Sequence, residues 1–420
     1  MRKLLLLLGF ACPSMLVMAQ DPASIISALQ STNSAIASQP CTTGEGPLIS
    51  NRAMNLFLAD RIGYYLSRYD DISFDKNYIT FNSADGVFSL NHNFFQAKGG
   101  DEQVKAFTVG GIKANVANAI ESGFTGRQYN NEIGLTIKRT WIAAVKTHFN
   151  PCNPASPLAP QKQDMDALRA SIVYSLQGQL TRKQAEFEKQ LDSIKPSDVP
   201  GQDINRVKSV LRQKFYADML DYLSWESARL QSDDLIATAN YNLVSTSWTS
   251  INGYVPILPQ KYLVANSLNS NLNTQYGYPI GLTISHTRFL ESSKMGRVFL
   301  TLSGDAYLDN SAQLNANEQY FGSFKNFITP VVNLQIIYFP PASHIGMNLA
   351  VEQNFGTYNA LNGIVGIPIV LIDKAGHPAA NFQLQCRFFD LTSKVLPNKA
   401  IFDKTSVGLT VGVPFSKIIY

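Results

Sequence analysis

The sequence predicts a mainly β fold: an antiparallel transmembrane β-barrel of about 12 strands with an inserted periplasmic α-helical hairpin. Three observations lead to this prediction: a last segment that alternates apolar and polar residues, many earlier segments with similar alternation, and an N-terminus typical of exported proteins. Composition agrees, since charged residues make up 16% of the chain, below the roughly 25% of an average soluble protein.

The last segment, from Thr405 to Phe415, alternates without error. Its apolar residues stand at every second position and are Val407, Leu409, Val411, Val413 and Phe415. Such a strand fits a half-buried soluble sheet, or a barrel wall with lipid outside and a polar lumen inside. Repetition of the pattern along the chain favours the barrel.

Alternating segments recur in two blocks. The expected strands are 77–82, 86–95, 104–117 and 129–147 in the first block, and 236–250, 278–290, 295–309, 326–339, 343–356, 360–373, 378–390 and 405–416 in the second. Many are longer than the roughly 5–6 residues of a globular strand and long enough for the roughly 9–11 of a transmembrane one. Tyr254–Leu268 is expected to be a loop, because Pro256 and Pro259 would interrupt a ladder. Strands there and in part of 51–69 would raise the count to about 14.

The N-terminus indicates export. A basic start, a short apolar run and the small residue Ala19 before Gln20 are typical of a secretory signal peptide over residues 1–19. No later run of about 18 apolar residues could form a spanning helix. Only helices and closed barrels satisfy their backbone groups in lipid, so a membrane location would require the barrel.

A charged segment separates the two blocks. Lys162 to Asp234 contains 11 Lys/Arg and 12 Asp/Glu, and its apolar residues follow a helical period on either side of the turn Lys195–Gly201. This pattern predicts two amphipathic helices, an αα-hairpin. The expected organisation is a signal peptide (1–19), an N-terminal periplasmic or plug segment (20–75), a first barrel segment (76–148), the helical insertion (149–235) and a second barrel segment (236–420).

Topology places the helices on one side of the barrel. Four strands before the insertion return the chain to the side of the N-terminus, which is the periplasm in outer-membrane barrels. The longer connections 117–128, 252–277, 310–325 and 391–404 then all lie on the other side. Long outer loops with short periplasmic turns are the expected asymmetry.

These alternating segments, with the aromatic-ended last strand, resemble the outer-membrane β-barrel proteins of Gram-negative bacteria over roughly Asn77–Tyr420, the helices excepted. In that class the assembly machinery reads apolar residues at alternate positions back from a terminal aromatic, and here the pattern fits when counted back from Phe415. The resemblance implies an outer-membrane location, lipid around the barrel and assembly through the last strand. A periplasmic protein that binds the helical hairpin is a further candidate partner.

Few residues point to chemistry. The five histidines are dispersed with no metal-ligand spacing, and no nucleophile elbow or phosphate-binding glycine loop is present. Outer-membrane phospholipases use a serine and a histidine two residues apart on one strand, whereas Ser285 and His286 are adjacent and face opposite sides. The net charge of +4 and the lack of a basic run do not favour nucleic-acid binding. The sequence therefore predicts no enzyme, cofactor or metal site.

Long polar side chains are expected to line the lumen. They are Lys138, Arg297, Asp305, Asn333, Gln335, Asn348, Glu352, Gln383, Gln385 and Arg387. Either they fill and close a narrow barrel, or they line a solute path. Residues 50–69 carry Met54, Phe57, Leu58, Ile62 and Tyr65 on one helical face, as a plug or a periplasmic helix would.

The leading hypothesis is a channel or transporter for small solutes. The main alternative is a non-transporting structural or interaction barrel, and an outer-membrane lipase or a soluble secreted adhesin is less favoured. Cys386 is expected on the lipid-facing side. Cys41 and Cys152 would both lie in the oxidising periplasm, which predicts a disulfide between them.

Overall fold

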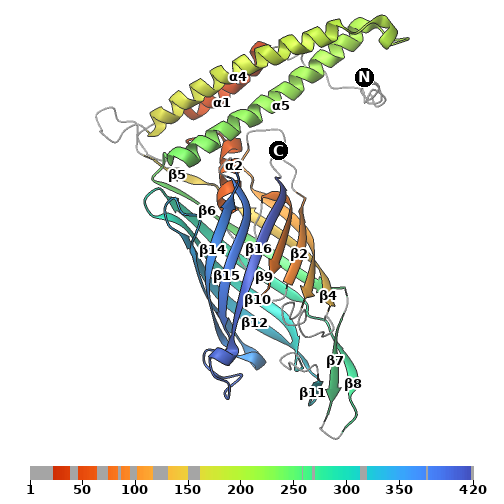
Figure 1. Cartoon of the computed structure of the whole chain (residues 1–420), viewed down its shortest axis with the longest axis vertical. Coiled ribbons are helices and arrows are strands. Elements are labelled where there is room, and N and C mark those ends of the chain that lie inside the picture. The colour runs from red at the N-terminus through yellow and green to blue at the C-terminus, as the bar shows by residue number, and fades with distance from the viewer. Residues whose placement is uncertain are drawn as a thin grey trace.

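The computed structural model describes most of the chain. The described residues are 22–37, 46–63, 74–83, 87–94, 102–116, 131–149, 161–257, 259–266, 270–312, 319–374 and 377–417. They form a barrel with helices gathered at one end and a small sheet at the other (Figure 1).

Within the described ranges, twelve antiparallel strands close into the barrel. In chain order they are β1 (Asp75–Asn82), β2 (Val87–Asn93), β3 (Ala106–Val116), β4 (Asn131–Ile142), β6 (Leu243–Pro256), β9 (Gly281–Ser292), β10 (Gly296–Asn310), β12 (Asn326–Phe339), β13 (Met347–Asn354), β14 (Leu361–Ile372), β15 (Pro378–Phe388) and β16 (Thr405–Lys417). Two pairings complete the ring, because β1 pairs with β16 and β4 pairs with β6 across the helical insertion. The predicted antiparallel barrel of about 12 strands is confirmed.

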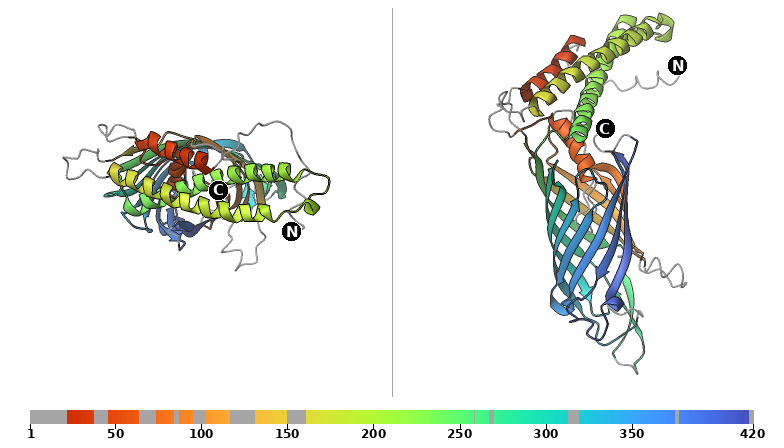
Figure 2. Two further views of the ribbon diagram at one scale, coloured as in Figure 1. Left: turned by 90° about the horizontal axis from the view of Figure 1, so that it is seen from above. Right: turned by 60° about the vertical axis from the view of Figure 1, so that its left-hand side comes forward.

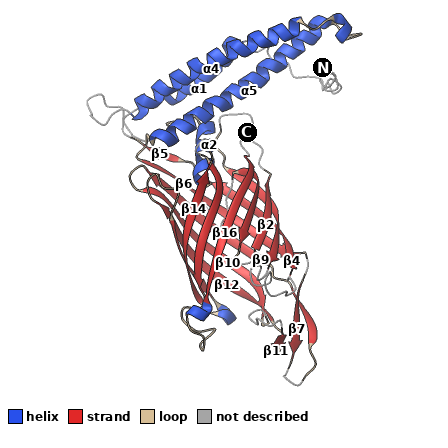
Figure 3. Ribbon diagram, viewed as in Figure 1, coloured by secondary structure: helices blue, strands red, loops and turns tan. Residues whose placement is uncertain are grey.

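Four α-helices occur in the described residues: α1 (Pro22–Ala37), α2 (Asn51–Ile62), α4 (Gln161–Asp192) and α5 (Ile204–Thr238). All lie at the same end of the barrel (Figure 3). Single turns of 3-10 helix stand at η2 (Pro196–Asp198), η3 (Gly356–Tyr358) and η4 (Phe402–Lys404). No helix in this part of the chain combines the length and the apolar composition needed to cross a membrane.

Helices α1, α4 and α5 pack on one another above the barrel (Figure 2). Their shared apolar cluster consists of Ile25, Leu29, Ile172, Val173, Leu176, Leu180, Met219 and Leu223. Farther along, Phe187 of α4 stacks on Phe215 of α5 with ring centroids 4.1 Å apart, and Arg212 pairs with Glu188 at 2.8 Å. The helices therefore have a core of their own. The sequence analysis did not predict α1.

The opposite end of the barrel carries a three-stranded sheet of β7 (Gln260–Ala265), β8 (Asn273–Gly277) and β11 (Gln319–Phe321). The prediction that Tyr254–Leu268 is a loop was wrong, since this range contains the end of β6 and all of β7. The prolines did not break the ladder because Pro256 is the last residue of β6 and Pro259 precedes β7.

Two more boundaries differ from the sequence prediction. The strand expected at 236–250 begins only at Leu243, because α5 continues to Thr238 and ends at Ala239, whose φ is 48°. After β4, the short strand β5 (Lys146–His148) continues the pairing along β6. The described parts of the long connections 252–277, 310–325 and 391–404 do lie at the end opposite the helices, where Figure 1 shows β7, β8 and β11, whereas 117–128 lies outside the described residues.

Candidate functional site

The two faces of the barrel wall differ sharply in polarity. On β9, Leu282 and Ile284 are 48% and 50% exposed on the outside, whereas Thr283 and Ser285, which alternate with them, are 8% and 2% exposed. The same alternation runs through β10, β12 and β13. Apolar residues thus cover the outer surface and polar residues the interior, the reverse of a soluble barrel.

All ten predicted lumen residues occupy buried or partly buried positions of barrel strands. The structure brings several together: Gln335 donates to Asn348 at 3.0 Å, and Arg387 pairs with Glu352 at 3.3 Å. Gln383 donates to Gln385 at 3.2 Å. Lys138, on β4, and Asp305, on β10, have two strands between them, and Arg297 lies apart at the helix end.

A continuous polar row crosses seven neighbouring strands. Its members are directly paired in register and are Thr140, Ser250, Ser285, Ser303, Asn333, Glu352 and Asn362. None is more than 5% exposed. Thr140 and Ser250 share a hydrogen bond of 3.0 Å, and Asn362 donates to Glu352 at 2.7 Å.

The predicted set of lumen residues did not include the four serine and threonine residues of this row, nor Asn362. Ser285 and Ser303 stand on the polar faces of the predicted strands, but the predicted lumen set contains only long side chains. The signal was the alternation itself, which puts small hydroxyl residues of neighbouring strands on one face. Ser285 and His286 do face opposite sides, and His286 shares a 3.0 Å hydrogen bond with Thr249 on the outer surface.

Several atoms in the polar interior lack a hydrogen-bond partner. Both amide atoms of Asn333 are buried and unpaired, as are the hydroxyl of Ser285 and the Oε1 atom of Gln383. Buried polar groups are normally hydrogen-bonded, and leaving one unpaired costs about 1–3 kcal/mol. The interior is therefore polar without being a fully connected network.

Toward the helix end the interior becomes apolar. Trp248, Phe289 and Phe299 point inward and are at most 1% exposed. The rings of Phe289 and Phe299 lie 5.1 Å apart, and those of Trp248 and Phe299 lie 6.5 Å apart. These side chains belong to the same cluster as Met54, Leu56, Phe57, Leu58 and Ile62 of α2. Helix α2 closes this mouth of the barrel as an apolar plug.

An ion pair fixes the C-terminal end of α2 to the barrel wall. Arg61 lies 3.2 Å from Glu291 of β9, and the Tyr241 hydroxyl donates to the same carboxylate at 2.9 Å. The Arg61 guanidinium also stacks on Phe57, 5.3 Å from the ring centroid. Burial, with the neighbouring Glu291 charge, raises the pKa of Tyr241, so this hydroxyl stays protonated and donates.

Polar contacts hold α2 to the barrel turns. Asp60 contacts His377, in the turn between β14 and β15, at 2.8 Å, and Asn381 donates to the carbonyl of Gly63. Asn55 donates to the carbonyl of Glu102 and accepts from the N–H of Val104, both at 2.9 Å. The plug is therefore fixed to two turns of the rim.

Helix α2 is also joined to α5. The Arg52 guanidinium lies 4.3 Å from the ring centroid of Trp225, bonds to Ser224 and stands 3.8 Å from Asp221. The N–H of Ser50 donates to Gln231 at 3.1 Å. The plug thus links the barrel to α5, the longer of the two helices α4 and α5, which together are called the arm.

At the other end of the interior, polar contacts gather around the buried Asp390. Its carboxylate accepts the backbone N–H groups of residues 394–396 at 2.7–3.0 Å, and the Lys404 ammonium lies 3.9 Å away. Asn362 of the polar row accepts from the N–H of Asp390. Burial raises the pKa of Asp390, but these N–H groups and Lys404 lower it by more, so it lies below its ordinary value.

The sequence comparisons found no match among family models or curated proteins. The described residues hold no group of His, Cys, Asp and Glu able to bind a metal. Cys386 is a free, partly exposed thiol on the outer side of β15. Cys41, Cys152 and Tyr65 lie outside the described residues.

Proposed function

We propose that this chain is an outer-membrane β-barrel of a Gram-negative bacterium. The observation that carries the proposal is the apolar outer surface around a polar interior, which a barrel in lipid requires and a soluble one avoids. The signal-peptide pattern of residues 1–19 and the alternating last strand support it. Cell fractionation tests it: recovery of the protein in buffer without detergent would contradict it.

Within this proposal the barrel is a channel for small solutes, and the resting state of the channel is closed. Polar rows along the interior would carry a polar solute, while α2 and the aromatic layer beneath it close the periplasmic mouth. Passage then requires α2 to leave the mouth, which breaks the contacts of Arg61 and Asp60. The arm of α4 and α5, as a periplasmic helical hairpin, offers a protein partner a route to α2 through Arg52.

Conductance in planar bilayers tests the closed channel. The double variant Phe57→Ala/Arg61→Ala removes the plug's central ring and its ion pair with Glu291. We expect rare openings in the native protein and frequent ones in the variant. Arg212→Ala is the matched control, because it removes an arginine ion pair within the arm, away from the barrel.

A second candidate function is a non-transporting anchor that holds the helical arm at the membrane. The buried state of the polar row favours it, since residues such as Thr140, Asn333 and Asn362 are 0% exposed. A folded Phe57→Ala/Arg61→Ala variant with no conductance above the lipid background would favour the anchor over the channel.

A further inference from the structure

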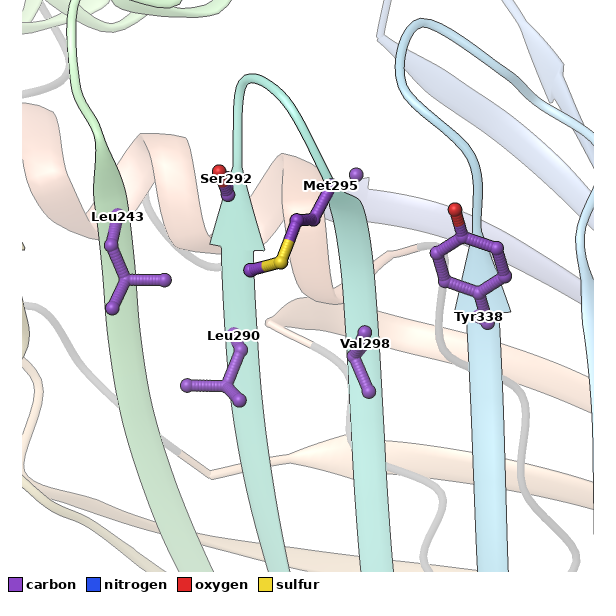
Figure 4. A pocket seen from close by; sticks show the side chains of 7 residues that line it. Leu243, Leu290, Ser292, Met295, Val298 and Tyr338 are labelled. Atoms are coloured by element: carbon purple, nitrogen blue, oxygen red, sulfur yellow. The ribbon is translucent and has the colours of Figure 1, made fainter.

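A shallow groove lies on the outer surface of the barrel near the helix end. Its volume is about 360 Å³, and its lining residues are Leu243, Leu290, Ser292, Met295, Gly296, Val298 and Tyr338. Leu290, Val298 and Tyr338 are the outward residues between buried neighbours on β9, β10 and β12. Figure 4 shows Met295 reaching across the strands from the β9–β10 turn, with the Tyr338 hydroxyl toward the rim.

Three cations surround this groove. Arg288 is exposed on β9, one outward position before Leu290, and Lys146 and Lys294 are exposed on β5 and in the β9–β10 turn. In register, Lys146 pairs with Ser245 and Arg288 with Ser247 on the intervening β6. Neighbouring strands are about 4.8 Å apart and two residues along a strand span about 7 Å, so the Cα atoms of the two cations flank β6 at roughly 12 Å.

This charge stands out against the outward faces of the neighbouring strands. Arg288 is the one charged side chain at the outward positions of β9, β10, β12, β13 and β14, which are described throughout. None of those positions, nor of those on β5 and β6, carries a carboxylate. On the outward faces of these strands, the cations beside the groove therefore have no acidic side chain to neutralise them.

We propose that the groove and its cations bind one anionic phospholipid of the periplasmic leaflet. One acyl chain lies over Leu290, Val298 and Tyr338, and the phosphate lies at the rim between Lys146 and Lys294. Arg288 extends toward that phosphate along the wall, as long cationic side chains do near a membrane surface. The inference rests on the proposed outer-membrane location but is independent of whether the barrel conducts.

A second copy of the chain fits this surface less well. In a two-fold dimer the same patch meets itself, so the cations would face their own copies without a carboxylate between them. An anionic lipid supplies the missing charge and continues the apolar surface of the neighbouring strands.

Native mass spectrometry of the purified protein in detergent tests the proposal. The probes are phosphatidylglycerol and phosphatidylethanolamine with identical acyl chains. We expect the native protein to bind phosphatidylglycerol more tightly than phosphatidylethanolamine. The Arg288→Gln variant should bind phosphatidylglycerol about fivefold more weakly, which is the effect of removing one cation at a lipid surface. Phosphatidylethanolamine binding should change little. Val298→Phe, which fills the groove, should weaken the binding of both lipids.

Arg139→Gln is the matched control, because Arg139 is also exposed on the outer wall but bonds to Thr108 away from the groove. Equal binding of the two lipids, or equal losses from Arg139→Gln and Arg288→Gln, would overturn the proposal. A dimer that Val298→Phe dissociates, with no lipid bound, would overturn it in favour of an interface between copies. Heat-modifiable gel mobility checks folding, and flotation with liposomes separately tests membrane insertion.

Discussion

The inner and outer faces of the barrel wall are built from the same strands yet follow opposite rules. On β12, Leu334 is 48% exposed on the outside, while its neighbours Asn333 and Gln335 are 0% and 3% exposed within. Because side chains alternate with period two, a shift of one residue would exchange the faces completely. Register is therefore what gives this chain an apolar surface and a polar interior.

The interior itself has two regions that depend on different forces. Near the helices, Phe299 and its neighbours form an ordinary apolar core completed by α2. Farther down, Asn333 and Glu352 continue a row of polar contacts. The apolar region depends on close packing, and the polar region depends on hydrogen bonds.

The largest effect is expected from truncating the apolar interior. Phe299→Ala should lower the free energy of unfolding by about 3–5 kcal/mol, because it leaves a cavity beneath α2. Leu334→Ala, on the outer face, should cost less, since lipid or detergent can fill the space. Unfolding in urea, followed by heat-modifiable gel mobility, measures both. Similar losses would show that the outer face is packed like the core.

The next effect concerns charge on the two faces of the last strand. Leu409→Arg, on the outward side of β16, should block assembly, because an arginine at the bilayer midplane costs about 2–4 kcal/mol. Thr410→Arg, one residue later on the inner side, should be tolerated better. The amount of folded barrel in the membrane fraction measures this. Equal effects would contradict the assignment of the two faces.

A disulfide between Cys41 and Cys152 would tie the N-terminal segment to the end of the first barrel segment. Gly46 donates its N–H to the carbonyl of Thr147, and each cysteine stands five residues beyond that bond, in opposite directions along the chain. Antiparallel pairing beyond that bond would bring them opposite one another. Thiol labelling of the denatured, unreduced mature protein should find one reactive cysteine, Cys386. Three reactive cysteines would exclude the bridge.

The smallest effect is expected within the polar interior. Asn333→Val should leave stability unchanged or raise it by about 1 kcal/mol, because both amide atoms of Asn333 are buried without a partner. Asn348→Val removes the acceptor of Gln335 and should cost about 1–3 kcal/mol. Thermal unfolding monitored by circular dichroism compares the two. A larger loss from Asn333→Val would reveal a ligand or water at that amide.

The barrel could be predicted from the sequence because its signal is local and repeated. Residues 326–339 were predicted as a strand with the bounds observed, and the alternation around Glu352 and Gln385 placed both on the polar side. The end of β6 at Pro256 and the start of β7 directly after Pro259 were missed, since proline disrupts a ladder only where its missing N–H would have been paired.

The sequence by itself determined the barrel class, a strand number of about 12, the two faces and the helical character of residues 162–234, because period and composition are properties of neighbouring residues. Only the tertiary structure decided that α2 closes the barrel mouth, that Arg61 meets Glu291, and that seven strands align one polar row. Each of these joins residues far apart in the chain. Such contacts depend on strand register and closure of the ring, which no local pattern records.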